Sequence, residues 1–365
     1  MAEILLDSIL TKAVKAGASD IHLKVATKPT MRINGALKTI DGFDALSIED
    51  LKAFTKIMPT KLKKDFDVKG DADYAYAINN VSRFRVNTFT QRGTTAFAFR
   101  IIPRLDFDIM SIGLPPIVQT LAMEKRGLIL VTGITGSGKS TTLAAMIDHI
   151  NRQEEVNIIT LEDPIEFLHS DKKALISQRE ISNDTTSFAE GLRRALRQDP
   201  DIILVGEMRD METVETAIHA AETGHLVFST LHTLDALETI NRILAMFPPH
   251  QQPQIRIQLA SVLRAIISQR LIPTADGQGR VPAAEIMINT AAVRDAITDT
   301  NKLETIEDLI AQGRDVYQSQ TFDQSLYELV SSGHVTEQEA LNWVKKKDNF
   351  KLMLKGISAR TYSPD

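Results

Sequence analysis

Hydrophobic and polar residues follow two different patterns along the chain. The first, over residues 1–102, predicts one helix followed by short strands. Apolar residues recur at helical spacing over 3–16, and Gly17 ends this predicted helix. The pair Asn34-Gly35 is a strong hairpin-turn signal after a short strand at 31–33. Further strands are predicted at 73–78, 82–90 and 94–102, the first two joined by a turn at Asn79-Asn80.

The second pattern begins at Gly127, where apolar strands alternate with helices. Each strand is a near-continuous apolar run, as expected for parallel strands that are covered on both faces. The predicted strands are 127–132, 156–161, 201–205 and 225–231. Helices are predicted at 210–223 and at 253–271. Between them, Asp235 and Glu238 form a capping-box-like start for another helix. After Pro282 the pattern predicts helical and more polar structure.

These patterns predict two domains and a C-terminal extension. Residues 1–102 are expected to form a small α+β domain, and 117–290 an α/β core with a mostly parallel sheet. Prolines at both ends and a glycine indicate a linker or hinge at 103–116. Residues 291–365 are expected to form a C-terminal helical region.

Composition narrows the possible functions. The chain has 365 residues, 43% of them hydrophobic, and a net charge of −5, so it gives no general electrostatic signature for nucleic acid. It has no cysteine, which excludes disulfides, thiolate catalysis and cysteine zinc sites. The N-terminal pattern is not that of a signal peptide, and no apolar run approaches a membrane span. A soluble, cytoplasmic protein is the simplest expectation.

The sequence G-I-T-G-S-G-K-S at 133–140 lies between the strand at 127–132 and a helix-prone run at 141–150. Strand, glycine loop and helix are the context in which this motif binds phosphate, because backbone N–H groups and the helix N-terminus converge on the anion. Lys139 would reach the β- and γ-phosphates, and the Ser140 hydroxyl would ligate Mg²⁺. A glycine-rich turn with a stray lysine is the alternative. The predicted nucleotide-binding residues are Gly133, Thr135, Gly136, Ser137, Gly138, Lys139, Ser140 and Thr141.

Polar residues suited to phosphoryl transfer follow the other predicted core strands, at the edge where open α/β sheets bind ligands. Glu207, at the tip of one strand, is expected to act on Mg²⁺ or its waters. A carboxylate in the turn 162–166 suits a general base. His232 is a candidate contact for the γ-phosphate, with a hydrogen-bonded core or turn histidine as the alternative; His225, at the other end of its strand, is a weaker candidate.

These stretches resemble motifs of the bacterial secretion and pilus ATPases. The sequence E-D-P-I-E at 162–166 resembles their Asp box, and G-E-M-R-D at 206–210 their atypical Walker B motif, with glycine in place of the usual aspartate. The stretch 224–233 resembles their His box, while 17–22 and 83–87 resemble their N-terminal domain. The resemblance covers nearly the whole chain and is greatest to the PilT/PilU-type twitching-motility ATPases, which retract type IV pili.

The resemblance implies a PAS-like N-terminal domain, a RecA-like core and a homohexameric ring with ATP at its subunit interfaces. Glu166 would be the catalytic glutamate, Glu207 the Walker B glutamate and, with Ser140, a Mg²⁺ contact. Arg85 and Arg100 of the N-terminal domain would act on the nucleotide. The implied partners are the inner-membrane pilus platform protein and, indirectly, pilin, with the motor peripheral at the inner membrane. No nucleic acid is expected.

Two features bear on the branch of the family. Assembly and type II secretion ATPases generally carry a tetracysteine motif, so the absence of cysteine favours retraction. Retraction ATPases usually read A-I-R-N-L-I-R-E where this chain has A-V-R-D-A-I-T-D at 292–299. That departure leaves open an accessory nucleotide-binding paralogue that regulates another motor, and an assembly or secretion ATPase. A RecA-like nucleic-acid translocase is a further alternative, which the acidic net charge opposes.

Overall fold

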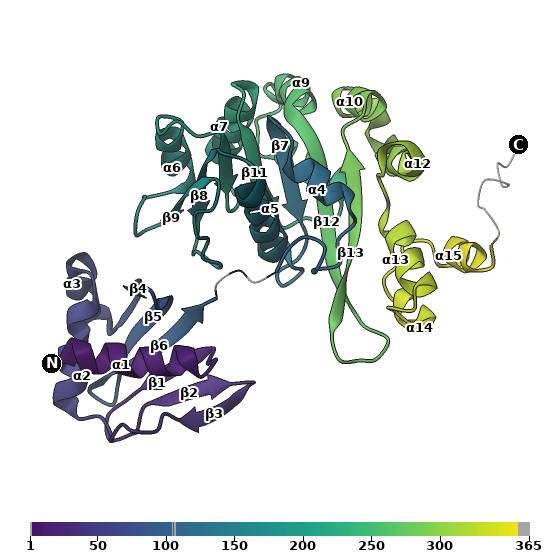
Figure 1. The fold of residues 1–365 in the computed structure, drawn as a ribbon. Helices are drawn as coiled ribbons and strands as arrows, with labels where there is room; N and C mark the ends of the chain where they lie inside the picture. The colour runs from purple at the N-terminus through teal and green to yellow at the C-terminus, as the bar shows by residue number, and fades with distance from the viewer. Residues whose placement is uncertain (1, 104, 106, 357–365) are drawn as a thin grey trace, which may run out of the picture. The chain divides into compact units, whose positions relative to one another are not determined.

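The computed structural model describes residues 2–103, 105 and 107–356 (Figure 1). The chain forms two compact units: Met1–Arg104 with Ile165–Leu168, and Leu105–Pro164 with His169–Asp365. None of the described helices is both long and apolar enough to span a membrane. The finer division of the second unit into 117–290 and 291–365 stays a prediction.

The first unit is an antiparallel sheet with helices on one of its faces, and it has a hydrophobic core of its own. Its sheet order is β3-β2-β1-β6-β5-β4. The predicted helix and both predicted hairpins are confirmed. The elements are α1 (Ala2–Lys15), β1 (Asp20–Leu23), β2 (Thr30–Ile33), β3 (Ala36–Thr39), α2 (Ile48–Phe54), η1 (Thr55–Ile57), α3 (Thr60–Lys69), β4 (Asp71–Ile78), β5 (Ser82–Gln91) and β6 (Thr94–Ile102).

The second unit is built on a sheet of order β13-β12-β7-β11-β10-β8-β9, in which only the β12–β13 pair is antiparallel among the described strands. The four predicted core strands are confirmed as β7, β8, β10 and β11. The elements are α4 (Ile117–Ala122), β7 (Gly127–Thr132), α5 (Lys139–Gln153), β8 (Asn157–Glu162), β9 (Leu175–Glu180), α6 (Phe188–Ala195), β10 (Ile202–Val205), α7 (Met211–Glu222), β11 (Leu226–Leu231), α8 (Ala236–Ala245), α9 (Gln252–Val262), β12 (Leu263–Pro273), β13 (Arg280–Ile288), α10 (Ala291–Thr298), η2 (Thr300–Thr305), α11 (Ile306–Gln312), α12 (Arg314–Tyr317), α13 (Phe322–Ser331), α14 (Glu337–Ala340) and α15 (Lys347–Leu354).

Helices cover both faces of this sheet. Alternate residues of β7 explain the two layers: Ile129 and Val131 pack with α4 and α5, whereas Leu128 and Leu130 pack with α7, α8 and α9. The C-terminal helices α13, α14 and α15 pack on the turn-proximal part of the β12–β13 pair around Phe322 (Figure 1). This doubly covered α/β sheet agrees with the predicted ATPase core.

The predicted helix at 253–271 is wrong in its second half. Residues 252–262 are helical, but Leu263 adopts an extended conformation and begins the long strand β12. Strand β12 lies between β7 and β13, so most of its residues are buried, and its apolar residues occur on both faces. Such a run also fits helical spacing, which is why the pattern was ambiguous. The chain after Pro282 is likewise not immediately helical, because β13 continues to Ile288.

Candidate nucleotide site

The glycine loop begins where β7 ends and leads directly into α5. Gly133, Gly136 and Gly138 have φ values of 142°, 79° and 94°, which only glycine adopts at little cost. Lys139 is buried, and its Nζ donates to the carbonyl oxygens of Gly133 (2.8 Å) and Ile134 (3.1 Å). The loop therefore holds a buried positive charge at the N-terminus of a 15-residue helix, which is the electrostatic requirement for a phosphate site.

The remaining predicted phosphate-loop residues share this environment. Ser140 and Thr141 lie in the first turn of α5 and are half-buried, whereas Thr135 and Gly136 are exposed at the loop surface. The Ser137 side chain is 2% exposed, and its Oγ has no hydrogen-bond partner within the described part of the chain. A bound phosphate oxygen would satisfy that buried hydroxyl, so the loop fits a nucleotide phosphate.

Strand β12 packs beside the glycine loop and supports it. The sequence could not indicate this role, because this stretch was predicted to be helical. Thr132 donates through Oγ1 to Ser268 Oγ (2.9 Å), and Gln269 donates through Nε2 to Thr142 Oγ1 on α5 (2.9 Å). A Cβ added at Gly133 would lie 2.5 Å from the Gln269 carbonyl oxygen. The loop is thus packed against β12 so closely that its first position admits no side chain.

Glu207 and His232 meet at the carboxyl ends of β10 and β11. His232 Nε2 lies 3.5 Å from Glu207 Oε1, and Arg209 Nε lies 2.7 Å from Glu207 Oε2. The structure thus brings His232 to Glu207, while His225 lies at the opposite end of β11 and contacts the Ala220 carbonyl oxygen (2.9 Å). Arg209 was not predicted as a partner of Glu207, although it stands two residues away in the same motif.

A side chain at Gly206, in the stretch 206–210, would crowd its neighbours. A Cβ at Gly206 would lie 3.0 Å from the Leu161 carbonyl oxygen and 3.3 Å from Phe188 Cε1. The Gly206 N–H donates to that same carbonyl (2.8 Å), and Thr230 Oγ1 donates to the Gly206 carbonyl (2.7 Å). The backbone of β10 is therefore held against β8 just before Glu207.

The Asp-box turn is anchored by side chains of β8 and β9. Glu162 Oε1 accepts hydrogen bonds from Thr160 Oγ1 (2.7 Å) and Gln178 Nε2 (3.0 Å), and Gln178 Oε1 accepts the His169 N–H (3.0 Å). Burial lowers the pKa of His169 to about 4, so its ring is neutral at physiological pH. Glu166 is exposed and belongs to the segment Ile165–Leu168 of the first unit.

Arg85 and Arg100 are direct cross-strand neighbours on β5 and β6, and both are exposed. Cross-strand partners point to the same face of a sheet, so the two guanidinium groups share one surface. Arg100 Nε donates to Asp20 Oδ1 on β1 (2.9 Å). Burial would raise the pKa of Asp20, but hydrogen bonds from Arg100 and Ser19 and the Arg100 charge outweigh it and lower the pKa below the usual value.

The predicted residues therefore fall into two groups. The phosphate loop, Glu207 and His232 lie at one edge of the core sheet, and Glu166, Arg85 and Arg100 belong to the first unit. A cavity of about 630 Å³ among the C-terminal helices, lined in part by Glu307, Asp323 and Lys346, contains none of these residues.

Known proteins resemble this chain over nearly its whole length. The family described as type II/IV secretion system protein matches residues 1–360. The type IV pilus retraction ATPase PilT of Pseudomonas aeruginosa is 43% identical over 346 residues, which are 94% of this chain and 99% of PilT. The type IV pilus ATPase PilU of the same species is 34% identical, covering 96% of this chain and 91% of PilU.

A crystal structure of the pilus retraction motor PilT with bound ADP matches with a TM-score of 0.82 and 45% identity, over 96% of this chain and 98% of that one. A doubly covered α/β core with a phosphate loop, following a smaller α+β unit, is thus shared with a nucleotide-bound ATPase. The chain belongs to the type II/IV secretion system protein family. The resemblance stated from the motifs is confirmed.

Proposed function

We propose that this chain is an ATPase motor that retracts type IV pili and works as a homohexamer. The observation that carries this proposal is the joint presence of a formed phosphate loop around Lys139 and a Glu207–His232 pair at the same sheet edge. The relatives that match over nearly the full length are a retraction ATPase and a pilus ATPase. The similarity of the fold to the ADP-bound retraction motor PilT supports the same activity here.

The site suggests a role for each residue. The N–H groups of the loop and Lys139 would hold the β- and γ-phosphates of ATP, and His232 would contact the γ-phosphate end. Ser140 and Glu207 would hold Mg²⁺, which supplies charge neutralisation on the phosphates and keeps most of its ligands as water and phosphate oxygens. Glu166 would orient and deprotonate the attacking water.

Arg85 and Arg100 would complete the site from the first unit by stabilising charge on the transferring phosphoryl group. We place this contact between subunits of a ring, as the resemblance implies. The partners would be the platform protein of the inner membrane and, through it, pilin. The motor would then act from the cytoplasm, peripheral to that membrane.

The first test is steady-state ATPase activity of the assembled protein beside its Glu166→Gln variant, with ADP binding measured on both. Turnover in the wild type, its loss in the variant and retained ADP binding in both are the expected results. Since the Gln side chain keeps the size but not the basicity of Glu166, equal turnover in the two proteins would rule out the proposed base.

An accessory, non-hydrolysing paralogue remains the second candidate because of residues 292–299. These residues form most of α10, where Val293 and Ile297 are buried and the Ile297 carbonyl accepts a hydrogen bond from Arg256 (3.1 Å). The apolar face of the usual motif is therefore kept, while its second basic–acidic pair is replaced by Thr298 and Asp299. Tight ADP binding with negligible turnover in the wild type would favour this second candidate.

A further inference from the structure

A buried carboxylate lies in the same row of the core sheet as the start of the phosphate loop. Glu285 on β13 is 2% exposed and pairs in register with Ser268 on β12. Ser268 pairs in turn with Thr132, and Thr132 with Leu231. The row thus ends at the residue before His232, so Glu285 is at the level of the nucleotide site but two strands away from its glycine loop.

Glu285 reaches the turn that follows His232. Its Oε1 accepts a hydrogen bond from the backbone N–H of Ala236, the first residue of α8 (2.9 Å). A helix N-terminus leaves such N–H groups without intrahelical partners, and a carboxylate there is electrostatically favoured. The turn from His232 to Ala236 is consequently held at both ends, by β11 pairing before it and by Glu285 after it.

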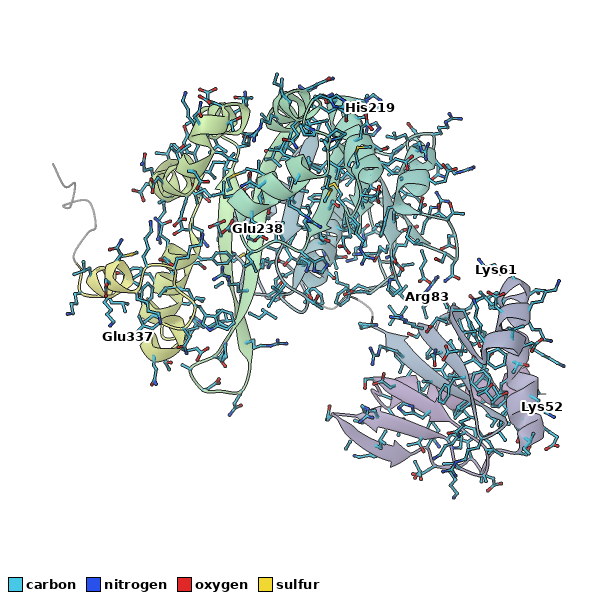
Figure 2. All side chains as sticks on the ribbon, turned by 180° about the vertical axis from the view of Figure 1, so that it is seen from behind. Lys52, Lys61, Arg83, His219, Glu238 and Glu337 are labelled. Atoms are coloured by element: carbon cyan, nitrogen blue, oxygen red, sulfur yellow. The ribbon has the colours of Figure 1, made fainter. Side chains whose placement is uncertain are left out.

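A second side chain fixes the same turn from the C-terminal part of the chain. Asp235 caps α8 by accepting the N–H of Glu238 (2.9 Å), and Lys345 Nζ lies 2.9 Å from the other carboxylate oxygen of Asp235. Glu238, labelled in Figure 2, accepts the N–H of Leu234 through Oε2 (2.8 Å). Side-chain interactions therefore hold each residue from Leu234 to Ala236: Glu238 binds the Leu234 N–H, Lys345 pairs with Asp235, and Glu285 binds the Ala236 N–H.

Lys345 is itself fixed among the C-terminal helices. Its backbone N–H donates to Asp323 Oδ1 on α13 (3.0 Å), and its Nζ also lies 3.3 Å from Glu307 Oε2 on α11. Only about a third of the Lys345 side chain is exposed, at 34%. A displacement of these helices would therefore move the charge that holds Asp235.

We propose that Glu285 and Lys345 are positioning residues that keep His232 against Glu207 and transmit movements of the C-terminal helices to the nucleotide site. His232 is 44% exposed and its contact to Glu207 is 3.5 Å long, so its position depends on the backbone of its turn. The inference rests on the proposed ATPase function, because the affected quantity is turnover. It adds two residues that touch neither phosphate loop nor catalytic carboxylate.

The charge around Glu285 agrees with this geometry. Burial, the largest cause, raises the pKa of Glu285 to about 7. The hydrogen bond from the Ala236 N–H and the charge of Lys345 lower this pKa, and the carboxylates of Asp235 and Glu307 raise it. Burial likewise opposes the charge on Lys345, but the hydrogen bond and charge of Asp235, followed by the charges of Glu285 and Glu307, raise its pKa above the usual value. The charge of Arg270 also lowers the pKa of Asp235.

The experiment compares Lys345→Met with Lys346→Met in the assembled full-length protein. Lys346 is the matched control because, within the described residues, it pairs with Glu307 (3.8 Å) and not with Asp235. Lys345→Met is expected to lower kcat about fivefold while the Kd for ADP changes by less than about twofold, since the phosphate loop is untouched. Lys346→Met is expected to retain wild-type values of both.

Glu285 is tested by a conservative and a non-conservative change. Glu285→Gln keeps an oxygen for the Ala236 N–H and is expected to retain more turnover than Glu285→Leu, which removes it. A purely structural role predicts instead that melting temperature and ADP affinity fall together with kcat, and that result would overturn the proposal. Equal kcat in the Lys345 and Lys346 variants would also overturn it, with the ATPase function standing. A wild type without turnover would overturn the proposed function and this inference together.

Discussion

At the scale of single residues, Gly206 shows how a motif residue can be required for space alone. The Gly206→Ala variant would bring a methyl group to 3.0 Å from the Leu161 carbonyl oxygen and 3.3 Å from the Phe188 ring. We expect a loss of about 1–2 kcal/mol in the free energy of unfolding, because overpacking in a rigid interior is costly. We also expect lower kcat, because the shifted strand carries Glu207. Thermal unfolding and steady-state turnover measure the two effects.

The control for this variant is Gly279→Ala. A Cβ at Gly279 would meet its nearest neighbour, Thr274 Oγ1, at an ordinary 3.8 Å, so this change should leave both stability and turnover close to wild type. If the two variants behaved alike, Gly206 would be in its position for some reason other than the close approach of Leu161.

Glu285 makes stability depend on pH in an identifiable direction. Its pKa is about 7 in the folded chain against an ordinary 4.5, chiefly because of burial, so the folded state holds the proton more tightly than the unfolded state. Between these two values stability falls as pH rises, by about 3 kcal/mol for a shift of this size, and above about 7 the penalty is constant.

The Glu285→Gln variant cannot titrate at this position, so its stability relative to wild type should increase between about pH 5 and about pH 8. Urea unfolding at those two pH values measures the difference. Glu337→Gln, at an exposed carboxylate on α14 (labelled in Figure 2), is the control for the replacement of a glutamate by glutamine. A constant stability difference between Glu285→Gln and wild type would mean that Glu285 titrates near its ordinary pKa in the folded chain.

At the scale of elements, the sequence predicted what depends on local pattern and failed where two patterns coincide. Strand β7, the glycine loop and α5 follow from an apolar run, glycines at fixed spacing and a helix-prone run, all contiguous. Strand β12 was predicted as helix because a strand buried on both faces shows no alternation, and its apolar positions also matched a helical stripe. The supporting roles of Ser268 and Gln269 were missed as a result. Glu285, on β13, was missed because its partner Ala236 comes from a distant segment.

The β12 support gives a test at this scale. Gln269→Leu removes the donor to Thr142 on α5 from a buried position, so it should cost about 1–2 kcal/mol of stability. Because α5 carries the phosphate loop, ADP binding should weaken as well. Isothermal titration with ADP and thermal unfolding measure both, with the exposed Gln278→Leu as control. Unchanged ADP affinity would show that the loop keeps its geometry without this hydrogen bond.

At the scale of the whole molecule, the predicted site residues are divided between the two compact units of the chain. The phosphate loop, Glu207 and His232 come from the second unit, whereas Glu166, Arg85 and Arg100 come from the first. The motifs pointed to the phosphate loop, Glu207 and His232, and the family resemblance to Glu166, Arg85 and Arg100; that all of them act in one site stays a prediction. Which copy of the chain supplies the arginines cannot follow from local pattern, because motif spacing fixes neighbours within an element and not contacts between separately folded units.

Mixed assemblies decide this question. We expect Lys139→Ala and Arg85→Ala each to be inactive alone, the first without a phosphate-binding lysine and the second without an arginine at the transferring phosphate. If the arginine acts on a neighbouring subunit, an equal mixture of the two regains activity, since about a quarter of its head-to-tail interfaces pair an intact Lys139 with an intact Arg85. Mixing Lys139→Ala with the doubly substituted chain is the control, because no interface then contains the intact lysine. A mixture no more active than its parents would place Arg85 at the nucleotide of its own chain and remove the reason for requiring a ring.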